Sequence, residues 1–188
     1  MIMGSPSQTR RQRGYAWEKT IVKRFQDADD WEAVRLGSPS VSLPDVMAIN
    51  SIHSIIYAIE AKSGAGNTLY VPRDQIIRCL DWAAMFERYE YRDPILAFKF
   101  MGKKRLANGD HQSRPIREYF WTGELEWRLQ FKSSLIDSIA CTYDGRIYGV
   151  IQGERADVPG VTDALVKPTM NPADTNSVMH SVGAGGRF

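Results

Sequence analysis

The sequence predicts an α/β fold, a β-sheet covered by helices, from three stretches. Residues 14–28 repeat apolar side chains at helical spacing, residues 44–62 hold two apolar runs separated by a short polar turn, and residues 72–88 show a second helical pattern. The 188 residues, 43% of them apolar and 24% charged, have the composition of one globular domain with a sizeable core. No apolar run approaches the roughly 18 residues of a membrane span, and residues 1–14 lack the apolar core of a secretory signal. We therefore expect the chain to stay inside the cell and off the membrane.

The basic residues are unevenly distributed, although the net charge of +2 is too small to indicate a nucleic-acid partner by itself. They form two clusters, one before the first helix and one in the second half of the chain: Arg10, Arg11 and Arg13, and Lys99, Lys103, Lys104 and Arg105. Such patches can neutralise phosphates. A solvated face without a partner is the commoner meaning of a charge run, and both interpretations stay open.

A helix is predicted over residues 14–28, and residues 1–12 before it are expected to form a flexible basic arm. Apolar side chains recur at the spacing of an amphipathic helix: Trp17, Ile21, Val22 and Phe25. Glu18 shares this inward-facing stripe. A buried carboxylate is costly unless it is paired or binds a cation, so Glu18 is a candidate site residue. The alternative is a glutamate at the border of the stripe that reaches water.

A strand is predicted over residues 31–36, followed by a loop of small residues over 37–40. Arg35 alternates with its neighbours and therefore points to a different face of the strand. Ser38 lies in the loop, which leads directly to Pro44 and should pass close to the charged end of the next hairpin. Its hydroxyl is either a hydrogen-bonding group for a phosphate or a metal-bound water, or simply part of a turn.

The β-hairpin stretch contains the pattern on which the functional prediction depends. If Asn50 pairs with Ile55 across a four-residue loop, the register places Asp45 opposite Glu60. Opposed side chains have Cβ atoms roughly 5 Å apart, and two like charges there destabilise a sheet unless a cation lies between them. Lys62, two residues beyond Glu60, points to the same face. Such a set suits a divalent metal held by oxygen ligands with an ammonium alongside. A solvated cluster of ion pairs is the alternative.

The second helix is predicted to begin at Pro72 and to run to about Arg88. It is apolar over much of its circumference, with Trp82 and Phe86 among its large side chains. A helix of this kind is either deeply buried or also forms a subunit interface. We expect this helix to do both.

The second half of the chain contains further strand patterns. The predicted segments are a strand over 95–100, a protruding hairpin or loop over 101–115, a strand over 116–121 and a terminal hairpin over 141–151. Residues 129–138 are ambiguous, with one short helix as the interpretation.

From about residue 153 the composition changes to Pro, Gly, Ser, Asn and Asp, which cannot bury enough surface to fold alone. The expected organisation is therefore a flexible arm over residues 1–12, a folded domain over residues 13–152 and a disordered tail over residues 153–188.

Several catalytic motifs are missing from the sequence. There is no glycine-rich phosphate-binding motif before a helix and no Ser/His/Asp set. The three histidines, His53, His111 and His180, fall in a turn, a loop and the tail, and Cys79 and Cys141 lack the spacing of zinc ligands. These absences argue against histidine-driven hydrolysis and favour carboxylates with a metal.

Six stretches, in this order and at these spacings, resemble the PD…ExK nuclease pattern and, more specifically, the archaeal Holliday junction resolvases. They are RGYAWE (13–18), EAVRLGS (32–38), LPDVMAI (43–49), YAIEAKS (57–63), LYVPRDQ (69–75) and ILAFKF (95–100). The resemblance covers roughly residues 10–100, with the core motifs in 13–100 of the expected nuclease domain. It implies a restriction-endonuclease-like fold, a mixed central β-sheet flanked by helices. It also implies a homodimer that cuts two strands of a four-way DNA junction in recombination and repair.

The same resemblance assigns roles to individual residues. Glu18, Asp45 and Glu60 would ligate Mg²⁺, with Mn²⁺ as a substitute, either directly or through water. Lys62 would orient or activate the attacking water, and Ser38 matches the catalytic-loop serine of the family. Segment 101–115 and everything after about residue 138 have no counterpart in the pattern.

The residues expected to contact DNA combine the basic run with matched positions: Arg10, Arg11, Arg13, Arg35 and Gln75. Trp82 and Phe86 match aromatic positions of the family and are expected at the dimer interface. The expected location is the cytoplasm, associated with the nucleoid, or the host cytoplasm for a virus. Two alternatives remain: another PD…ExK nuclease of restriction, repair or replication type, and a non-catalytic DNA-binding protein.

Overall fold

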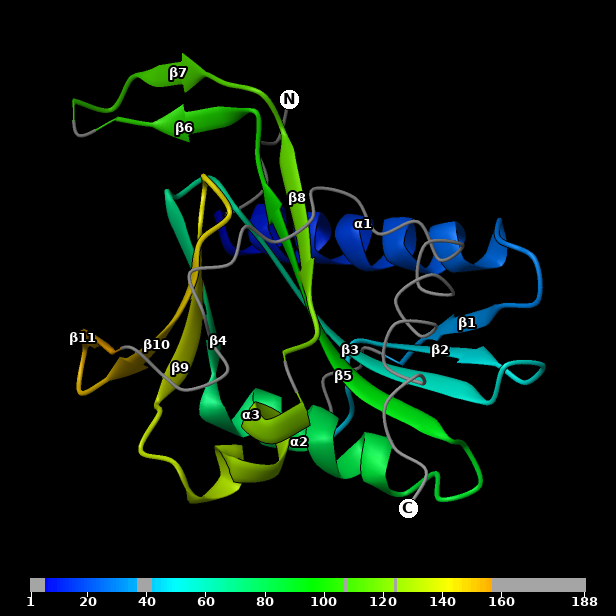
Figure 1. Cartoon of the computed structure of the whole chain (residues 1–188). Helices are drawn as coiled ribbons and strands as arrows, with labels where there is room; N and C mark the ends of the chain where they lie inside the picture. Colours follow the sequence, from blue (N-terminus) through cyan, green and yellow to red (C-terminus); the bar gives the residue numbers. More distant parts are fainter. Residues whose placement is uncertain (1–5, 37–41, 107, 124, 157–188) are drawn as a thin grey trace.

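The structure, a computed structural model, describes residues 6–36, 42–106, 108–123 and 125–156, without the side chains of residues 6–11, 105 and 125–127 (Figure 1). The helices are α1 (Pro6–Gln26), α2 (Arg73–Ala84), α3 (Leu125–Gln130) and a 3₁₀ turn, η1 (Phe131–Ser133). The strands are β1 (Glu32–Arg35), β2 (Val46–Asn50), β3 (Ile55–Gly64), β4 (Thr68–Pro72), β5 (Tyr91–Phe100), β6 (Lys103–Arg105), β7 (His111–Ser113), β8 (Arg117–Trp121), β9 (Ser138–Thr142), β10 (Ile147–Ile151) and β11 (Glu154–Ala156). Within these ranges, no helix combines the length and apolar character of a membrane span.

The central sheet has five strands in the order β1-β2-β3-β5-β8. Only β3 and β5 run parallel, and the three other neighbouring pairs are antiparallel. The parallel pair requires a crossover, which β4 and α2 supply between β3 and β5. The sheet is therefore mixed and flanked by helices, and the predicted fold class is confirmed (Figure 1).

The two faces of the central sheet are covered by different helices. Helix α1 buries Trp17, Ile21 and Phe25 against one face, which includes Ile59 and Ala61 of β3. On the other face, α2 buries its side chains together with alternate residues of the same strands: Met47, Ile56, Ala58, Cys79 and Ala83. Because side chains alternate along a strand, Glu60 and Lys62 point to the α2 side of the sheet.

A second sheet, in the order β11-β10-β9-β4, packs against the α2 side of the central sheet. Its core joins Leu96 and Phe98 of β5 to Ile139, Cys141 and Ile147. The predicted terminal hairpin is confirmed as β9 and β10. The pairing of β4 with β9, which makes the hairpin part of a larger sheet, was not predicted.

Three predicted boundaries are wrong by four residues or more. Helix α1 begins at Pro6 instead of residue 14, because proline is compatible with a first helical turn and the helix continues through Gly14. Helix α2 ends at Ala84 instead of Arg88, so Phe86 lies beyond it, in the turn that reverses the chain towards β5. Strand β5 begins at Tyr91 rather than residue 95 because it pairs along the whole of β3.

The protruding segment predicted at 101–115 is confirmed as the β6–β7 hairpin, which projects from the body at the upper left of Figure 1. The ambiguous segment at 129–138 holds the end of α3 and the η1 turn. Of the predicted tail, residues 154–156 form β11, and residues 157–188 lie outside the described residues.

Candidate active site

The candidate site lies where the β2–β3 hairpin opens towards the preceding loop. Asn50 pairs with Ile55 and Val46 pairs with Ile59, so the predicted register is confirmed. The next pair in this register is Asp45 with Glu60. The ladder itself stops at Val46, and the Oδ2 atom of Asp45 instead accepts a hydrogen bond from the backbone N–H of Ala61 at 2.8 Å. The charge of Asp45 raises the pKa of Glu60, so the two carboxylates are neighbours at the open end of the hairpin.

Glu60 is 1% exposed and is held by two cations. The ammonium of Lys62 lies 2.6 Å from one carboxylate oxygen, and the guanidinium of Arg78, on α2, lies 2.7 Å from the other. Sequence reasoning included Lys62 but missed Arg78. A signal was present, since Arg73 and Arg78 are the only basic residues of α2 and a buried carboxylate pair needs cations from the element that covers it.

Burial raises the pKa of Glu60, with Lys62 lowering it, Asp45 raising it further and Arg78 lowering it. Burial also raises the pKa of Asp45, and Glu18 adds to this effect, whereas the Ala61 N–H, Lys62 and Arg78 oppose it. Both carboxylates are thus less favourable as anions than in water. Their environment would gain from additional positive charge.

Glu18 and Arg35 form a second charged pair, on the α1 side of the sheet. Glu18 is 7% exposed, so the predicted inward position is confirmed. The Nε atom of Arg35 donates a hydrogen bond to the Oε2 atom of Glu18. The guanidinium also lies 4.1 Å from the centre of the Tyr15 ring. Asp45 connects the two pairs electrostatically, because its pKa responds to Glu18 on one side and to Lys62 and Arg78 on the other.

The model of the family described as archaeal Holliday junction resolvase (Hjc) matches residues 9–120. The chain belongs to this family. The matched segment includes α1, the β2–β3 hairpin and α2, and so contains Glu18, Asp45, Glu60 and Lys62 together with Arg78.

One solved structure similar to this resolvase-family chain is Hjc of Archaeoglobus fulgidus, a Holliday junction resolvase from an archaeal hyperthermophile. The two share 16% sequence identity with a TM-score of 0.46, over 70% of this chain and 84% of the other. A comparison with curated proteins gives no match.

The remaining predicted site residues of this Holliday junction resolvase family member are distributed around the same region. Ser38 lies outside the described residues, as do the side chains of Arg10 and Arg11. Arg13 is exposed on α1. Gln75 is half-buried on α2, and its Oε1 atom has no hydrogen-bond partner among the residues that the structure describes.

The two aromatic residues expected at a dimer interface lie at the C-terminal end of α2 and just beyond it. Trp82 and Phe86 are half-buried, with ring centres 6.3 Å apart, and both pack beside the apolar cluster between α2 and the sheet. The indole N–H of Trp82 donates to the backbone oxygen of Ser42 at 2.8 Å. Their role in dimerisation stays a prediction.

In the described part of the chain, no group of three His, Cys, Asp or Glu side chains is arranged to hold a metal ion. The carboxylates of the candidate site are instead engaged by protein groups. Both oxygens of Glu60 bond to cations, and Glu18 bonds to Arg35. Asp45 and Glu60 nevertheless supply the hard oxygen donors that a divalent ion prefers.

Proposed function

We propose that this chain is an endonuclease that resolves four-way DNA junctions by hydrolysing phosphodiester bonds with the help of a divalent metal ion. The observation that carries the proposal is the opposition of Asp45 and Glu60 at the end of the β2–β3 hairpin, in a chain of the archaeal Holliday junction resolvase family. Burial raises the pKa of both carboxylates, and the charge of Asp45 raises that of Glu60 further, so a cation bound between them would relieve this cost. This property supports metal binding more strongly than a structural ion-pair cluster.

The donor set fits Mg²⁺, with Mn²⁺ as a substitute. Mg²⁺ takes oxygen ligands and keeps several of its waters, so two or three carboxylates are enough. Asp45 and Glu60 would hold the ion, and Glu18 is the proposed third ligand, directly or through water. When bound, the ion would lower the pKa of a coordinated water and neutralise charge that develops on the phosphate.

The protein groups around Glu60 have distinct proposed roles. The ammonium of Lys62, with a side chain 25% exposed, is the group that can reach both Glu60 and a bound phosphate, and we assign it the positioning of the attacking water. The side chain of Arg78 is only 12% exposed and holds the other oxygen of Glu60. Arg78 is therefore a positioning residue, which keeps the carboxylate directed towards Asp45.

DNA contacts are proposed for the residues already expected from the sequence: Arg10, Arg11, Arg13, Arg35, Gln75 and, as a phosphate-binding hydroxyl, Ser38. A second copy of the chain, joined through Trp82 and Phe86, would provide the second active site that two symmetric cuts need. We further propose that residues 13–152 form the nuclease domain. The protein would act where its DNA substrate lies, in the cytoplasm of a cell or of a viral host.

The test is cleavage of a four-way junction compared with its separate linear arms, with and without Mg²⁺. The wild-type chain should nick opposing strands of the junction at symmetric positions and leave the arms mostly intact. Asp45→Asn and Glu60→Gln should reduce the cleavage rate by at least about 100-fold. Both variants should bind the junction as tightly or more tightly, because removing a carboxylate reduces repulsion of phosphate.

The matched control is Glu32→Gln, which removes an exposed carboxylate from β1 and should leave cleavage unchanged. Unaltered cleavage by both site variants would refute the assignment. Equal cleavage of junction and linear arms would indicate another type of PD…ExK nuclease. Salt-sensitive binding without Mg²⁺-dependent cleavage would indicate a non-catalytic DNA-binding protein.

A further inference from the structure

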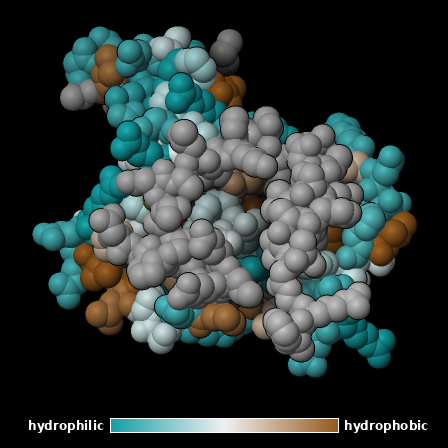
Figure 2. Space-filling view, viewed as in Figure 1, coloured by the Kyte–Doolittle hydropathy of each residue, from teal (hydrophilic) through white to brown (hydrophobic). Residues whose placement is uncertain are grey.

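The β6–β7 hairpin is a basic projection of the fold that the candidate active site does not use. Residues 101–115 contain four basic residues and one acidic residue: Lys103, Lys104, Arg105, Arg114 and Asp110. The carboxylate of Asp110 is occupied at the tip of the hairpin, where it accepts a hydrogen bond from the side chain of Asn108 at 2.8 Å. Figure 2 shows the projection as mostly hydrophilic, at the upper left of the molecule. Its net charge is therefore positive, with Lys103 exposed and Lys104 half-buried.

Arg114 fixes the base of this hairpin to the body of the protein. Its guanidinium donates to the backbone oxygens of Met101 at 3.0 Å, Ala65 at 2.9 Å and Gly66 at 2.8 Å. It also donates to the side-chain oxygen of Asn67 at 3.0 Å. These bonds tie both ends of the hairpin to the β3–β4 connection, so Arg114 is committed to structure and the lysines carry the free charge.

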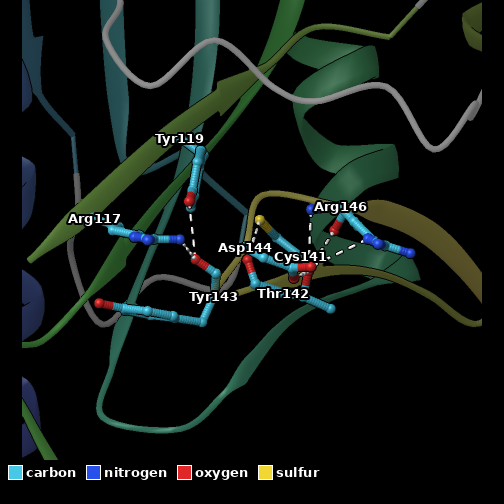
Figure 3. A network of polar contacts seen from close by, with 7 residues as sticks. All are labelled: Arg117, Tyr119, Cys141, Thr142, Tyr143, Asp144 and Arg146. Atoms are coloured by element: carbon cyan, nitrogen blue, oxygen red, sulfur yellow. Dashed lines mark hydrogen bonds and ion pairs between the residues drawn. The ribbon is translucent and has the colours of Figure 1, made fainter. Parts of the chain in front are cut away.

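The second sheet braces the same base through Tyr143. Two guanidiniums lie near the centre of its ring, that of Arg114 at 4.2 Å and that of Arg117 at 4.5 Å, and its hydroxyl donates to the backbone oxygen of Pro115 at 2.7 Å. The backbone oxygen of Tyr143 accepts from the hydroxyl of Tyr119 at 2.9 Å and from Arg117 at 3.2 Å (Figure 3). The hairpin is thus held in a defined direction by the β9–β10 turn, which is a structural reason for the second sheet.

The hairpin begins close to the candidate active site. Strands β3 and β5 end together, with Gly64 paired to Phe100, and the N–H of Met101 donates to the oxygen of Gly64 at 2.8 Å. Glu60 lies four residues earlier on β3. At about 3.3 Å per residue, the base of the hairpin is about 13 Å from Glu60 along the strand. This distance corresponds to about four base pairs of a DNA duplex.

We propose that the β6–β7 hairpin is a second DNA-binding element, which holds the duplex arm next to the cleaved strand through its phosphates. Lys103 and Lys104 are adjacent in β6, so their side chains point to opposite faces of the ribbon. A two-stranded ribbon fits the major groove of B-DNA, where charges on its two faces reach the phosphates of both walls. Within the described ranges, neither lysine takes part in an ion pair, so both ammoniums are available to phosphate. This inference rests on the proposed function, because it assumes a DNA substrate at Glu60.

The test is the affinity of the full chain for a four-way junction, measured without Mg²⁺ at several salt concentrations, for the double variant Lys103→Ala/Lys104→Ala. We expect affinity at physiological salt to fall by about tenfold and the slope of log K against log salt to decrease by about 1–2, as for the loss of one or two phosphate contacts. The single-turnover cleavage rate at saturating protein should match that of the wild type, because the substitutions leave the carboxylates untouched.

The matched control is Arg88→Ala/Arg92→Ala, which removes the same charge from exposed positions at the opposite end of β5. It should retain the wild-type salt slope, and thermal unfolding should show that both double variants are folded. An unchanged slope in the hairpin variant, or an equal loss in the control, overturns the hairpin proposal while junction cleavage still supports the enzyme. A loss of self-association instead of DNA affinity assigns the hairpin to a protein interface and also overturns it. Absence of junction binding by the wild type refutes the proposed function itself.

Discussion

Replacing Arg78 with methionine tests how strongly the fold depends on the cations around Glu60. Methionine keeps much of the volume of the side chain but removes one of the two groups that bond to a carboxylate with 1% exposure. Removal of one partner from a buried ion pair typically costs about 3–5 kcal/mol, because the other charge is left buried. Lys62 remains 2.6 Å from Glu60. We therefore expect Arg78→Met to lower the free energy of unfolding by about 2–3 kcal/mol.

Urea denaturation and thermal unfolding measure this loss. For a chain of this size, a loss of about 2–3 kcal/mol should lower the melting temperature by about 5–10 °C. The control is Arg88→Met, at an exposed position beyond the end of α2, which should change stability by no more than about 0.5 kcal/mol.

The pH dependence of the free energy of unfolding tests whether Glu60 causes the loss of stability in Arg78→Met. Burial raises the pKa of Glu60 above its model-peptide value of 4.5, so the folded state binds a proton more tightly than the unfolded state does. The contribution of this group to stability is therefore largest at low pH and declines as the pH rises from about 4.5 through the folded-state pKa. Without Arg78, which lowers this pKa, the decline should extend to higher pH and be larger in total. The difference between wild type and Arg78→Met should accordingly shrink towards pH 4.

A double-mutant cycle of Arg78→Met with Glu60→Gln tests whether Arg78 stabilises the fold through Glu60. If Arg78 stabilises the fold through Glu60, the coupling free energy between the two substitutions should exceed about 1 kcal/mol. Arg78→Met with a stability change below about 0.5 kcal/mol, or with no coupling to Glu60→Gln, would refute the assigned role of Arg78.

Two further predictions follow from other positions. Asp45→Asn should raise the free energy of unfolding at pH 7 by about 1 kcal/mol, because burial disfavours the charged carboxylate of Asp45 and an amide oxygen can still accept the hydrogen bond from Ala61. Urea denaturation measures this change, and a clear loss of stability would contradict the prediction. Gly145→Ala should destabilise the chain by about 1–3 kcal/mol, because Gly145 has φ of +88° and an added Cβ would lie 2.8 Å from the Tyr119 ring. A melting temperature of Gly145→Ala within 1 °C of that of the wild type would contradict this prediction and show that the β9–β10 turn accommodates the added Cβ atom.

Local patterns in the sequence predicted the centre of the molecule correctly. The register of the β2–β3 hairpin follows from the length of its turn and from the two-residue period of a strand, which together leave one pairing with the apolar residues buried. The inward position of Glu18 follows from the helical period in the same way. Both predictions depend on residues that are neighbours along the chain.

Predictions that involve distant segments were less successful. The pairing of β4 with β9 joins residues 68–72 to residues 138–142, and short apolar strands of this kind carry no information about their partner. For the same reason, the position of Arg78 above Glu60 depends on how α2 crosses the sheet. The early end of α2 likewise reflects the need to reverse the chain into a strand parallel to β3.

The sequence by itself determined which charged groups meet at the hairpin, namely Asp45, Glu60 and Lys62, because strand geometry alone sets their faces and spacing. Only the tertiary structure decided which cations neutralise the carboxylates and on which side of the sheet each pair lies. Arg78 reaches Glu60 from α2, whereas Arg35 holds Glu18 on the α1 side. The physical reason is that burial makes each carboxylate depend on a partner within hydrogen-bonding distance, and such partners come from elements brought together by packing.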